Sequence, residues 1–310
     1  MASSHFHFKM SESKQLPLNF GGIDEEQYSS FDPAAILVWP VSYEGTVSYG
    51  TGTGAGAMAI IDASRNMELY EEETDTEVYK LGIHTLPLFL PKEKPEIMMD
   101  GLYQEATNLL RSDKFLCTLG GEHSISGPII RAHKEKYPNI SVLQIDAHAD
   151  LREAYDGTPH SHASIMSRVV MDMRIPSVQV GIRSISREEA LALKGGLPTK
   201  IFWARDAAGR IDWIDEAIDS LTDDVYLTID IDGLDPSIVP TTGTPEPGGL
   251  GWYETLTLIW KLAESKKVVG MDLVEYSYVE RFEAPAFLCS KLIYKSLSYI
   301  FNGKTPKVTE

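Results

Sequence analysis

The feature that most constrains the fold is the segment 146–150, which reads Asp-Ala-His-Ala-Asp and directly follows the apolar run 140–145. The apolar run predicts a buried β-strand, and alternate side chains of an extended segment point the same way. We therefore expect Asp146, His148 and Asp150 to converge beyond the carboxyl end of a strand, where open α/β sheets bind ligands. Such a set suits a divalent cation, but the motif alone is equally compatible with a solvated loop.

Two further strand ends carry the same kinds of side chain. The segment 228–232, Thr-Ile-Asp-Ile-Asp, follows the apolar residues 225–227, and the segment 120–124, Gly-Gly-Glu-His-Ser, follows the apolar run 115–119. Together the strand ends supply six candidate ligands: His123, Asp146, His148, Asp150, Asp230 and Asp232. Four clustered carboxylates without cations would repel one another and raise their own pKa values. The sequence therefore predicts a site for two divalent cations.

Hydrophobic periodicity predicts strands that alternate with helices along the chain. The expected strands are 35–39, 115–119, 140–145, 177–182, 200–203, 225–231 and 268–274, and the expected helices are 57–70, 96–112, 124–137, 187–194, 211–221, 252–265 and 285–301. This alternation predicts an α/β fold of three layers, α/β/α, around a central, mostly parallel sheet. Residues 1–30 are expected to form a polar N-terminal extension that includes His5 and His7, and residues 31–310 a single domain.

Composition narrows the possible partners. A net charge of −17 argues against a nucleic-acid partner and suits a cationic substrate, although acidity also aids solubility. Cys117 and Cys289 lie in apolar contexts and are expected to be reduced core residues. The sequence lacks an apolar run of about 20 residues and a signal-peptide pattern, so no membrane partner and a cytoplasmic location are expected.

Six motifs in order resemble those of the ureohydrolase family of arginases and agmatinases. They are the segments 120–124 and 146–150, the segment 228–236 (Thr-Ile-Asp-Ile-Asp-Gly-Leu-Asp-Pro), and the segments 179–183, 242–249 and 272–275. The resemblance spans roughly residues 35 to 300. It implies the arginase/deacetylase-like fold, a catalytic domain over residues 31–310, and binuclear metal-dependent hydrolysis of a guanidino compound to urea and an amine. It also suggests a homotrimer or homohexamer.

The resemblance further implies how the six ligands divide. One ion would be held by His123, Asp146, Asp150 and Asp230, and the other by Asp146, His148, Asp230 and Asp232, so that Asp146 and Asp230 bridge. Oxygen-rich ligation favours Mn²⁺ over Zn²⁺, and Ni²⁺ or Co²⁺ would fit the same donors. Two such ions lower the pKa of a shared water, and the resulting hydroxide would attack the guanidinium carbon.

The resemblance also implies catalytic roles. Asp150 has one as a metal ligand, and two further residues match catalytic positions of the family. His162 matches the family's histidine that passes a proton to the leaving amine, and His160 is the alternative two residues away. Glu275 matches the carboxylate that pairs with the substrate guanidinium, and a surface salt bridge is its alternative. Asp235 is expected to shape a turn before a proline.

The segment 151–162 bears on the substrate. It lacks the arginase loop that reads the α-carboxylate and α-amino groups, and it resembles the agmatinase version. The first prediction is hydrolysis of agmatine to putrescine and urea, a step of polyamine biosynthesis. Arginine, guanidinobutyrate and small guanidines remain open as substrates. Arg152 could pair with a substrate carboxylate, although its place in the agmatinase-like segment favours an ordinary structural role.

Some residues depart from the family pattern, and others distinguish the ureohydrolases from related proteins. Thr241 and Tyr278 depart from the family pattern close to site residues, so the shape of the pocket could differ. The alternative from another class is a metal-binding homologue without catalytic activity, whose sequence mark would be the loss of a ligand, and all six ligands are present. A related one-metal zinc deacetylase is disfavoured by the Asp230 and Asp232 pair. His133 has charged neighbours in sequence and is expected on a solvated face without a site role.

Overall fold

The computed structural model describes residues 16–92 and 94–308, so His5 and His7 lie outside the described residues. Within the stretch predicted as a polar extension, Phe20 and Ile23 are buried and pack into the hydrophobic core. The described residues include no helix that combines the length and the apolarity needed to cross a bilayer.

The described residues form one sheet of eight strands, ordered β2-β1-β3-β8-β7-β4-β5-β6, in which every neighbouring pair is parallel. The strands are β1 (Ile36–Pro40), β2 (Ile83–Thr85), β3 (Phe115–Leu119), β4 (Ser141–Ile145), β5 (Ser177–Ile182), β6 (Thr199–Trp203), β7 (Asp224–Asp230) and β8 (Lys267–Val274). The predicted α/β class with a parallel sheet is confirmed. Parallel strands end at the same edge of a sheet, so the segments that follow β3, β4, β7 and β8 open at one edge.

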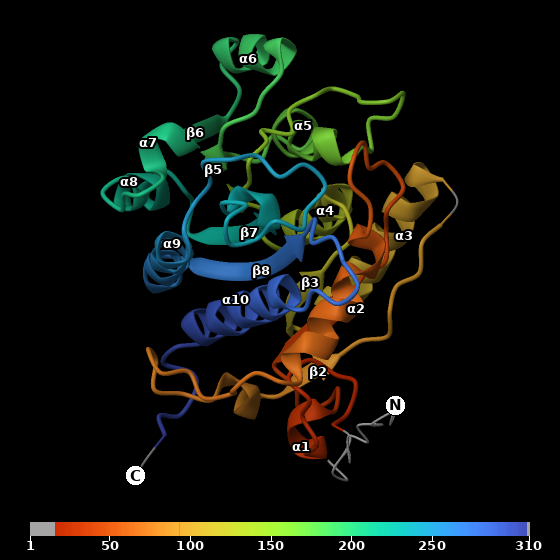
Figure 1. Ribbon diagram of the computed structural model, residues 1–310, viewed down its shortest axis with the longest axis vertical. Helices are drawn as coiled ribbons and strands as arrows, with labels where there is room; N and C mark the ends of the chain where they lie inside the picture. The colour runs from red at the N-terminus through yellow and green to blue at the C-terminus, as the bar shows by residue number, and fades with distance from the viewer. Residues whose placement is uncertain (1–15, 93, 309–310) are drawn as a thin grey trace, which may run out of the picture.

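Helices cover both faces of this sheet. They are α1 (Glu26–Ser29), α2 (Thr53–Ser64), α3 (Pro95–Leu110), α4 (Ser126–Lys136), α5 (Ile165–Ser167), α6 (Arg187–Lys194), α7 (Ala204–Ala207), α8 (Ile214–Asp219), α9 (Trp252–Ser265) and α10 (Ala284–Ile300). Single turns occur at η1 (Val78–Leu81), η2 (His123–Ile125), η3 (His162–Ser164) and η5 (Ile231–Gly233), with a π-helical segment η4 (Arg168–Asp172). Helices α2, α9 and α10 lie on one face and α3 and α4 on the other, which gives the three predicted layers (Figure 1).

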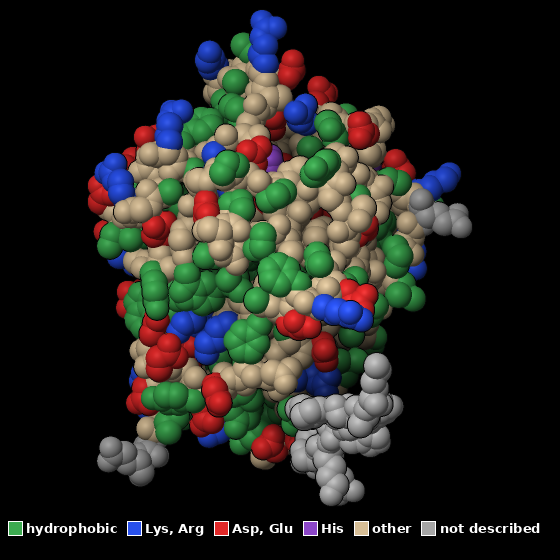
Figure 2. All heavy atoms as spheres, viewed as in Figure 1, with side chains coloured by type: hydrophobic (Ala, Val, Ile, Leu, Met, Phe, Trp, Pro, Cys, Tyr) green, Lys and Arg blue, Asp and Glu red, His purple; other side chains and the backbone are tan. Residues whose placement is uncertain are grey.

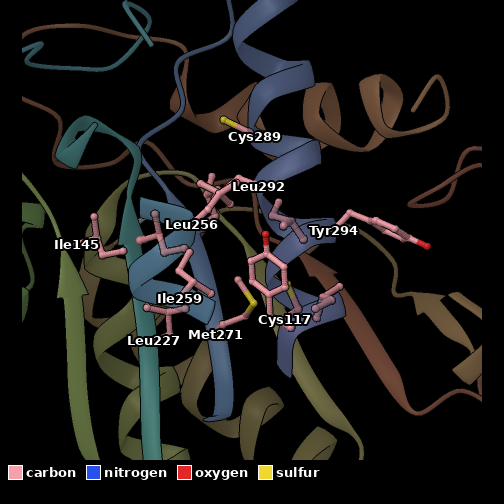
Figure 3. Packing of buried hydrophobic residues seen from close by; sticks show 14 of the residues in the cluster. Cys117, Ile145, Leu227, Leu256, Ile259, Met271, Cys289, Leu292 and Tyr294 are labelled. Carbon is pink, nitrogen blue, oxygen red and sulfur yellow. The ribbon is translucent and has the colours of Figure 1, made fainter. Parts of the chain in front are cut away.

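Two hydrophobic clusters hold the layers together. Along β1, Ile36 and Val38 belong to one cluster and Leu37 and Trp39 to the other, because successive strand residues point to opposite faces. The apolar strand runs therefore follow from burial on both faces. Figure 3 shows the first cluster, in which side chains of α9 and α10 meet those of the central strands. Cys117 and Cys289 are buried free thiols, as expected.

Several local predictions differ from the structure, and the following are the ones nearest the site and the sheet. The helix expected at 57–70 begins at Thr53 and ends at Ser64. Strand β2 was not expected, because it has only three residues and too little periodicity to recognise. The helical residues of η3, α5 and η4, between positions 162 and 172, were also not expected.

The solvated position predicted for His133 is wrong. Its ring is fully buried, Nδ1 donates to the Ile129 carbonyl at 2.8 Å, and the ring packs edge-on against Tyr226. A Cβ at Gly270 of β8 would lie 2.2 Å from Nε2, so the missing side chain there makes room for the imidazole. The charged neighbours in sequence project from other faces of α4, and burial lowers the pKa of His133 to about 4.

Candidate metal centre and active site

The six predicted ligands meet at the carboxyl edge of the sheet. A cavity of about 310 Å³ opens there, and its wall includes His123, His148, Asp150, Asp230 and Asp232. Asp146, the sixth predicted ligand, is fully buried beside them. Figure 2 shows a histidine at the bottom of a hollow in the upper part of the face in view.

The ligands form two groups that share Asp146. In the first group, His123 Nδ1 lies 3.0 Å from Asp146 Oδ2, 3.1 Å from Asp150 Oδ2 and 3.4 Å from Asp230 Oδ2. In the second group, His148 Nδ1 lies 2.9 Å from Asp232 Oδ2 and 3.7 Å from Asp146 Oδ1. Asp146 thus presents one oxygen to each imidazole. Two sets of donors among the described residues could each hold a metal ion: His123 with Asp146 and Asp150, and His148 with Asp146 and Asp232. Asp230 adds to the first set through its contact with His123.

Asp150 reaches this point differently from the expectation. Strand β4 ends at Ile145, and Asp150 has a left-handed backbone with φ of 52°. Extended alternation therefore does not continue through the segment 146–150. Instead the turn directs Asp146 and Asp150 toward His123, while His148 turns toward the second group. Left-handed residues other than glycine are uncommon and cluster at functional sites.

A buried chain of hydrogen bonds orients His123. The Thr228 hydroxyl donates to Asp272 Oδ1 at 2.6 Å, so its oxygen is left to accept from His123 Nε2 at 2.9 Å. Tyr226 donates to the other oxygen of Asp272 at 2.8 Å. A neutral His123 then directs the lone pair of Nδ1 at the carboxylates, and this buried atom has no hydrogen-bond partner among the described residues. Outer partners of this kind fix the tautomer of metal-ligating histidines.

The electrostatics of the cluster fit bound cations. Burial, reinforced by the charge of Asp146, raises the pKa of Asp150 to about 7. Burial acts to lower the pKa of His148, but its contacts with Asp146 and Asp232 raise it to about 12. Over residues 16–92 and 94–308, no lysine or arginine forms a salt bridge to these carboxylates. A dense group of acceptors that binds protons this strongly is suited to divalent cations.

Glu275 lies beside the first group at the end of β8. Its side chain is buried, its φ is 64°, and its Oε1 accepts from the backbone N–H of His123 at 2.7 Å. Burial, together with the charge of Glu122, raises the pKa of Glu275 well above its ordinary value. The carboxylate lines the cavity rather than the outer surface, so the alternative of a surface salt bridge does not hold.

The structure separates the two candidate histidines. His162 lines the cavity of the metal ligands, whereas His160 lines a neighbouring cavity with Arg131 and Arg168. His162 is the first residue of η3, whereas His160 precedes the N-cap residue Ser161, so the two side chains belong to different backbone segments.

Asp235 shapes a turn, as predicted. Its carboxylate accepts from the backbone N–H of Ser237 at 3.0 Å, of Gly248 at 2.8 Å and of Gly249 at 3.0 Å. Thr241 and Tyr278, the two departures from the family pattern, do not line the site cavity.

Some residues of the site were not anticipated. Glu122 stands within the recognised segment 120–124, where no role was expected of it, and it is fully buried. Thr46, which contacts both Glu122 and His162, lies in a loop rich in glycine, serine and threonine. No motif marks Thr46, so only the tertiary contact identifies it. Thr228 and Asp272 lie inside the motif segments 228–236 and 272–275, so the sequence marks these two residues through their motifs.

Comparisons with known proteins show the family of the chain. Residues 34–298 match the model of the Arginase family. The N(1)-aminopropylagmatine ureohydrolase of Synechocystis sp. is 39% identical over 89% of this chain and 92% of its own length. The agmatinase of Bacillus cereus is 34% identical over 84% and 89%. The solved agmatine ureohydrolase of Thermoplasma volcanium superposes with a TM-score of 0.80 at 27% identity, over 91% of this chain and 96% of that chain. The chain therefore belongs to the arginase family of ureohydrolases, which includes agmatinase-type members.

Proposed function

We propose that this protein hydrolyses the guanidino group of an agmatine-type substrate, releasing urea and a primary amine, within a catalytic domain over residues 31–310. The observation that carries the proposal is the pair of ligand groups that share Asp146 beside the buried carboxylate of Glu275. This arrangement supports a role for Glu275 in binding the guanidinium beside a site for two cations. All six donors are present, whereas a metal-binding homologue without activity would not require Glu275 in that position.

The donor set supports two Mn²⁺ ions. His123, Asp146, Asp150 and Asp230 would hold one ion, and Asp146, His148, Asp230 and Asp232 the other. Carboxylate oxygens outnumber imidazole nitrogens here, and such sites favour Mn²⁺ over Zn²⁺. When bound, the pair supplies Lewis-acid chemistry that lowers the pKa of a water molecule and polarises the substrate.

The residues of the chain itself bind substrate and move protons. Glu275 accepts hydrogen bonds from the planar guanidinium, an ionic and geometrically specific pairing. His162 gives a proton to the nitrogen that departs when the C–N bond breaks, a role suited to an imidazole near neutral pH.

Two substrates share this chemistry. Agmatine is the expectation from the segment 151–162, which lacks the arginase loop. N(1)-aminopropylagmatine, the same molecule with an aminopropyl extension, is the second candidate because the relative from Synechocystis sp. is named for it. The cavity wall includes Glu246 in addition to Glu275 and five of the six predicted ligands, and acidic groups suit amine-bearing substrates.

A substrate panel tests the proposal. The protein loaded with Mn²⁺, Ni²⁺, Co²⁺ or Zn²⁺ is incubated with agmatine, N(1)-aminopropylagmatine, arginine or guanidinobutyrate, and released urea is measured. We expect urea from one or both agmatine compounds, with the highest rate in Mn²⁺. Urea from arginine or guanidinobutyrate alone would overturn the substrate assignment. Two bound ions without urea release from any compound would favour the non-catalytic homologue.

We also propose a homotrimer or homohexamer in the cytoplasm, where the buried thiols of Cys117 and Cys289 remain reduced. Light scattering on the purified protein measures the assembly, and a monomer would contradict it.

A further inference from the structure

We propose that Thr46 and Glu122 are positioning residues that hold His162 in one tautomer. In this tautomer Nδ1 carries the proton, and the unprotonated Nε2 can exchange a proton in the cavity. The inference rests on the proposed function for its role in catalysis, but the tautomer itself can be measured independently. It is carried by a chain of hydrogen bonds that joins three separate segments of the sequence.

The first link joins the loop after β1 to the segment after β3. Glu122 Oε2 accepts from the Thr46 backbone N–H at 2.7 Å, and Glu122 N donates to the Tyr43 carbonyl at 3.0 Å. The two backbones are so close that a Cβ on Gly121 would lie 1.8 Å from the Tyr43 carbonyl oxygen. Only glycine leaves room for this approach, so Thr46 is fixed relative to Glu122.

The second link is the Thr46 hydroxyl, whose single proton determines the direction of its hydrogen bonds. Glu122 Oε1 accepts from the Thr46 hydroxyl at 2.6 Å and from the Ser124 hydroxyl at 2.6 Å. A threonine hydroxyl has one proton and two lone pairs. Because the Thr46 hydroxyl donates its one proton to the buried carboxylate of Glu122, its oxygen can only accept hydrogen bonds from other partners.

Both partners on the far side of Thr46 belong to His162. The backbone N–H of His162 donates to Thr46 Oγ1 at 3.1 Å, and Nδ1 lies 3.3 Å from the same oxygen. Nδ1 must therefore carry the proton for this contact to be a hydrogen bond. The ring of Tyr155 lies edge-on to the imidazole, with centroids 5.9 Å apart, and restrains its rotation.

Ser161 provides the competing arrangement. Its hydroxyl lies 3.4 Å from His162 Nδ1 and could donate to that nitrogen in the other tautomer. Ser161 also accepts from the Ala163 backbone N–H at 3.4 Å, so its oxygen can equally accept. Ser161 therefore tolerates either tautomer, and the fixed acceptor Thr46 decides between them.

The selected tautomer suits proton transfer. In the net reaction the oxygen of water ends in urea and its two protons end on the departing amine, which leaves as an ammonium. A bare Nε2 can take one of these protons from water and hand it to the amine nitrogen as the C–N bond breaks. Meanwhile Nδ1–H stays hydrogen-bonded to Thr46 Oγ1, which in turn donates to the carboxylate of Glu122. Burial lowers the pKa of His162, and Glu122 opposes this shift.

The tautomer is tested first, in metal-free protein labelled with ¹⁵N-histidine. The imidazole signals of His162 are assigned by their loss in His162→Asn. We expect Nδ1 protonated and Nε2 bare in the wild type, and a shift toward protonated Nε2 in Thr46→Val. Protonated Nε2 in the wild type would overturn the proposal, whether or not the enzyme is active.

The kinetic test uses metal-loaded variants at Thr46 and a control variant at Thr53, the first residue of α2. Thr46→Val should lower kcat about 10- to 100-fold, part of the contribution of general acid–base catalysis, with KM and metal content near wild type. Thr46→Ser should restore kcat, because the hydroxyl returns. Thr53→Val removes a buried hydroxyl that contacts Glu44 instead, and it should retain wild-type kcat.

The outcomes separate the two proposals. An active wild type with unchanged kcat in Thr46→Val would overturn this inference and leave the proposed function in place. An inactive wild type that shows the expected tautomer would overturn the proposed function alone.

Discussion

Three of the four carboxylate ligands are oriented by hydrogen bonds from nearby groups. Asp146 accepts from the Gln144 amide at 2.6 Å and from the His148 backbone N–H at 2.6 Å. Asp232 accepts from the Ala147 backbone N–H at 2.9 Å, and Asp230 accepts from the Asp232 backbone N–H at 2.9 Å. Such bonds hold lone pairs in place before any cation arrives, which reduces the free-energy cost of assembling the site.

The separation of the two histidines gives a prediction at this scale. We expect His162→Ala to lower kcat on the order of 10²–10⁴-fold with the metal content retained, since only a proton-transfer group is lost. His160→Ala is the matched control, because that side chain lines another cavity. Urea release and metal analysis on both variants measure this. A large loss in His160→Ala alone would show that the proton-transfer role belongs to His160.

Removal of the predicted bridging ligand tests the cation site. Asp230→Ala should abolish activity and lower the metal content together, because Asp230 approaches His123 and also positions Asp232. Metal analysis after gel filtration measures the change. Asp215→Ala, a surface aspartate paired with Lys261, serves as control. Two ions and full activity in Asp230→Ala would contradict the ligand assignment.

Among the elements, four adjacent strands supply the site. In the order β3-β8-β7-β4, the segments after these strands contribute His123, Glu275, the pair 230–232 and the segment 146–150. Helix α10 is held to the segment 71–73 by a buried ion pair. Lys295 donates to the buried Glu71 and lies 3.2 Å from Glu72.

The ion pair of α10 predicts a large effect on stability. Lys295→Met would leave the buried Glu71 with only the more distant Lys291, whose Nζ lies 4.0 Å from Oε2, and this should lower the free energy of unfolding by about 3–5 kcal/mol. Lys261→Met removes an exposed pair with Asp215 and should cost under about 1 kcal/mol. Urea denaturation monitored by circular dichroism measures both. Equal stability of the two variants would contradict the prediction.

The packing of α4 on β8 predicts a pH dependence of stability. His133 is buried neutral with a pKa of about 4, against about 6.5 in the unfolded chain, so the unfolded state binds the extra proton. Its contribution to stability is complete above pH 6.5 and is lost as pH falls toward 4, on the order of 3 kcal/mol in all. The difference in stability between wild type and His133→Asn should fall over that window. A constant difference would contradict the assignment.

The whole molecule carries a net charge of −17, and acidic side chains line the site cavity. A negative field concentrates cations near the surface and is screened by salt within about 10 Å at 0.1 M. The same charge disfavours polyanions, so the composition and the proposed substrate agree.

This charge predicts a salt dependence. For an agmatine-type substrate, kcat/KM should fall as NaCl rises from about 0.01 to 0.3 M, because the field that attracts the cation is screened. The rate at saturating substrate should change little. Potassium chloride in place of sodium chloride controls for a specific ion effect. A kcat/KM value independent of ionic strength would contradict electrostatic attraction.

The sequence alone determined the types of element and the chemistry of the site. Apolar runs mark the buried strands, and the motifs at their ends contain all six candidate ligands, because both signals are local. It could not determine neighbours that are distant along the chain. The ends of β3 and β4 meet across β8 and β7, and no local pattern encodes that order. The tertiary structure therefore decided that Asp146 is shared by the two ligand groups and that His133 is buried. It also decided that His162, rather than His160, faces the site, and that Thr46 contacts it. Each of these depends on contacts between segments that only folding brings together.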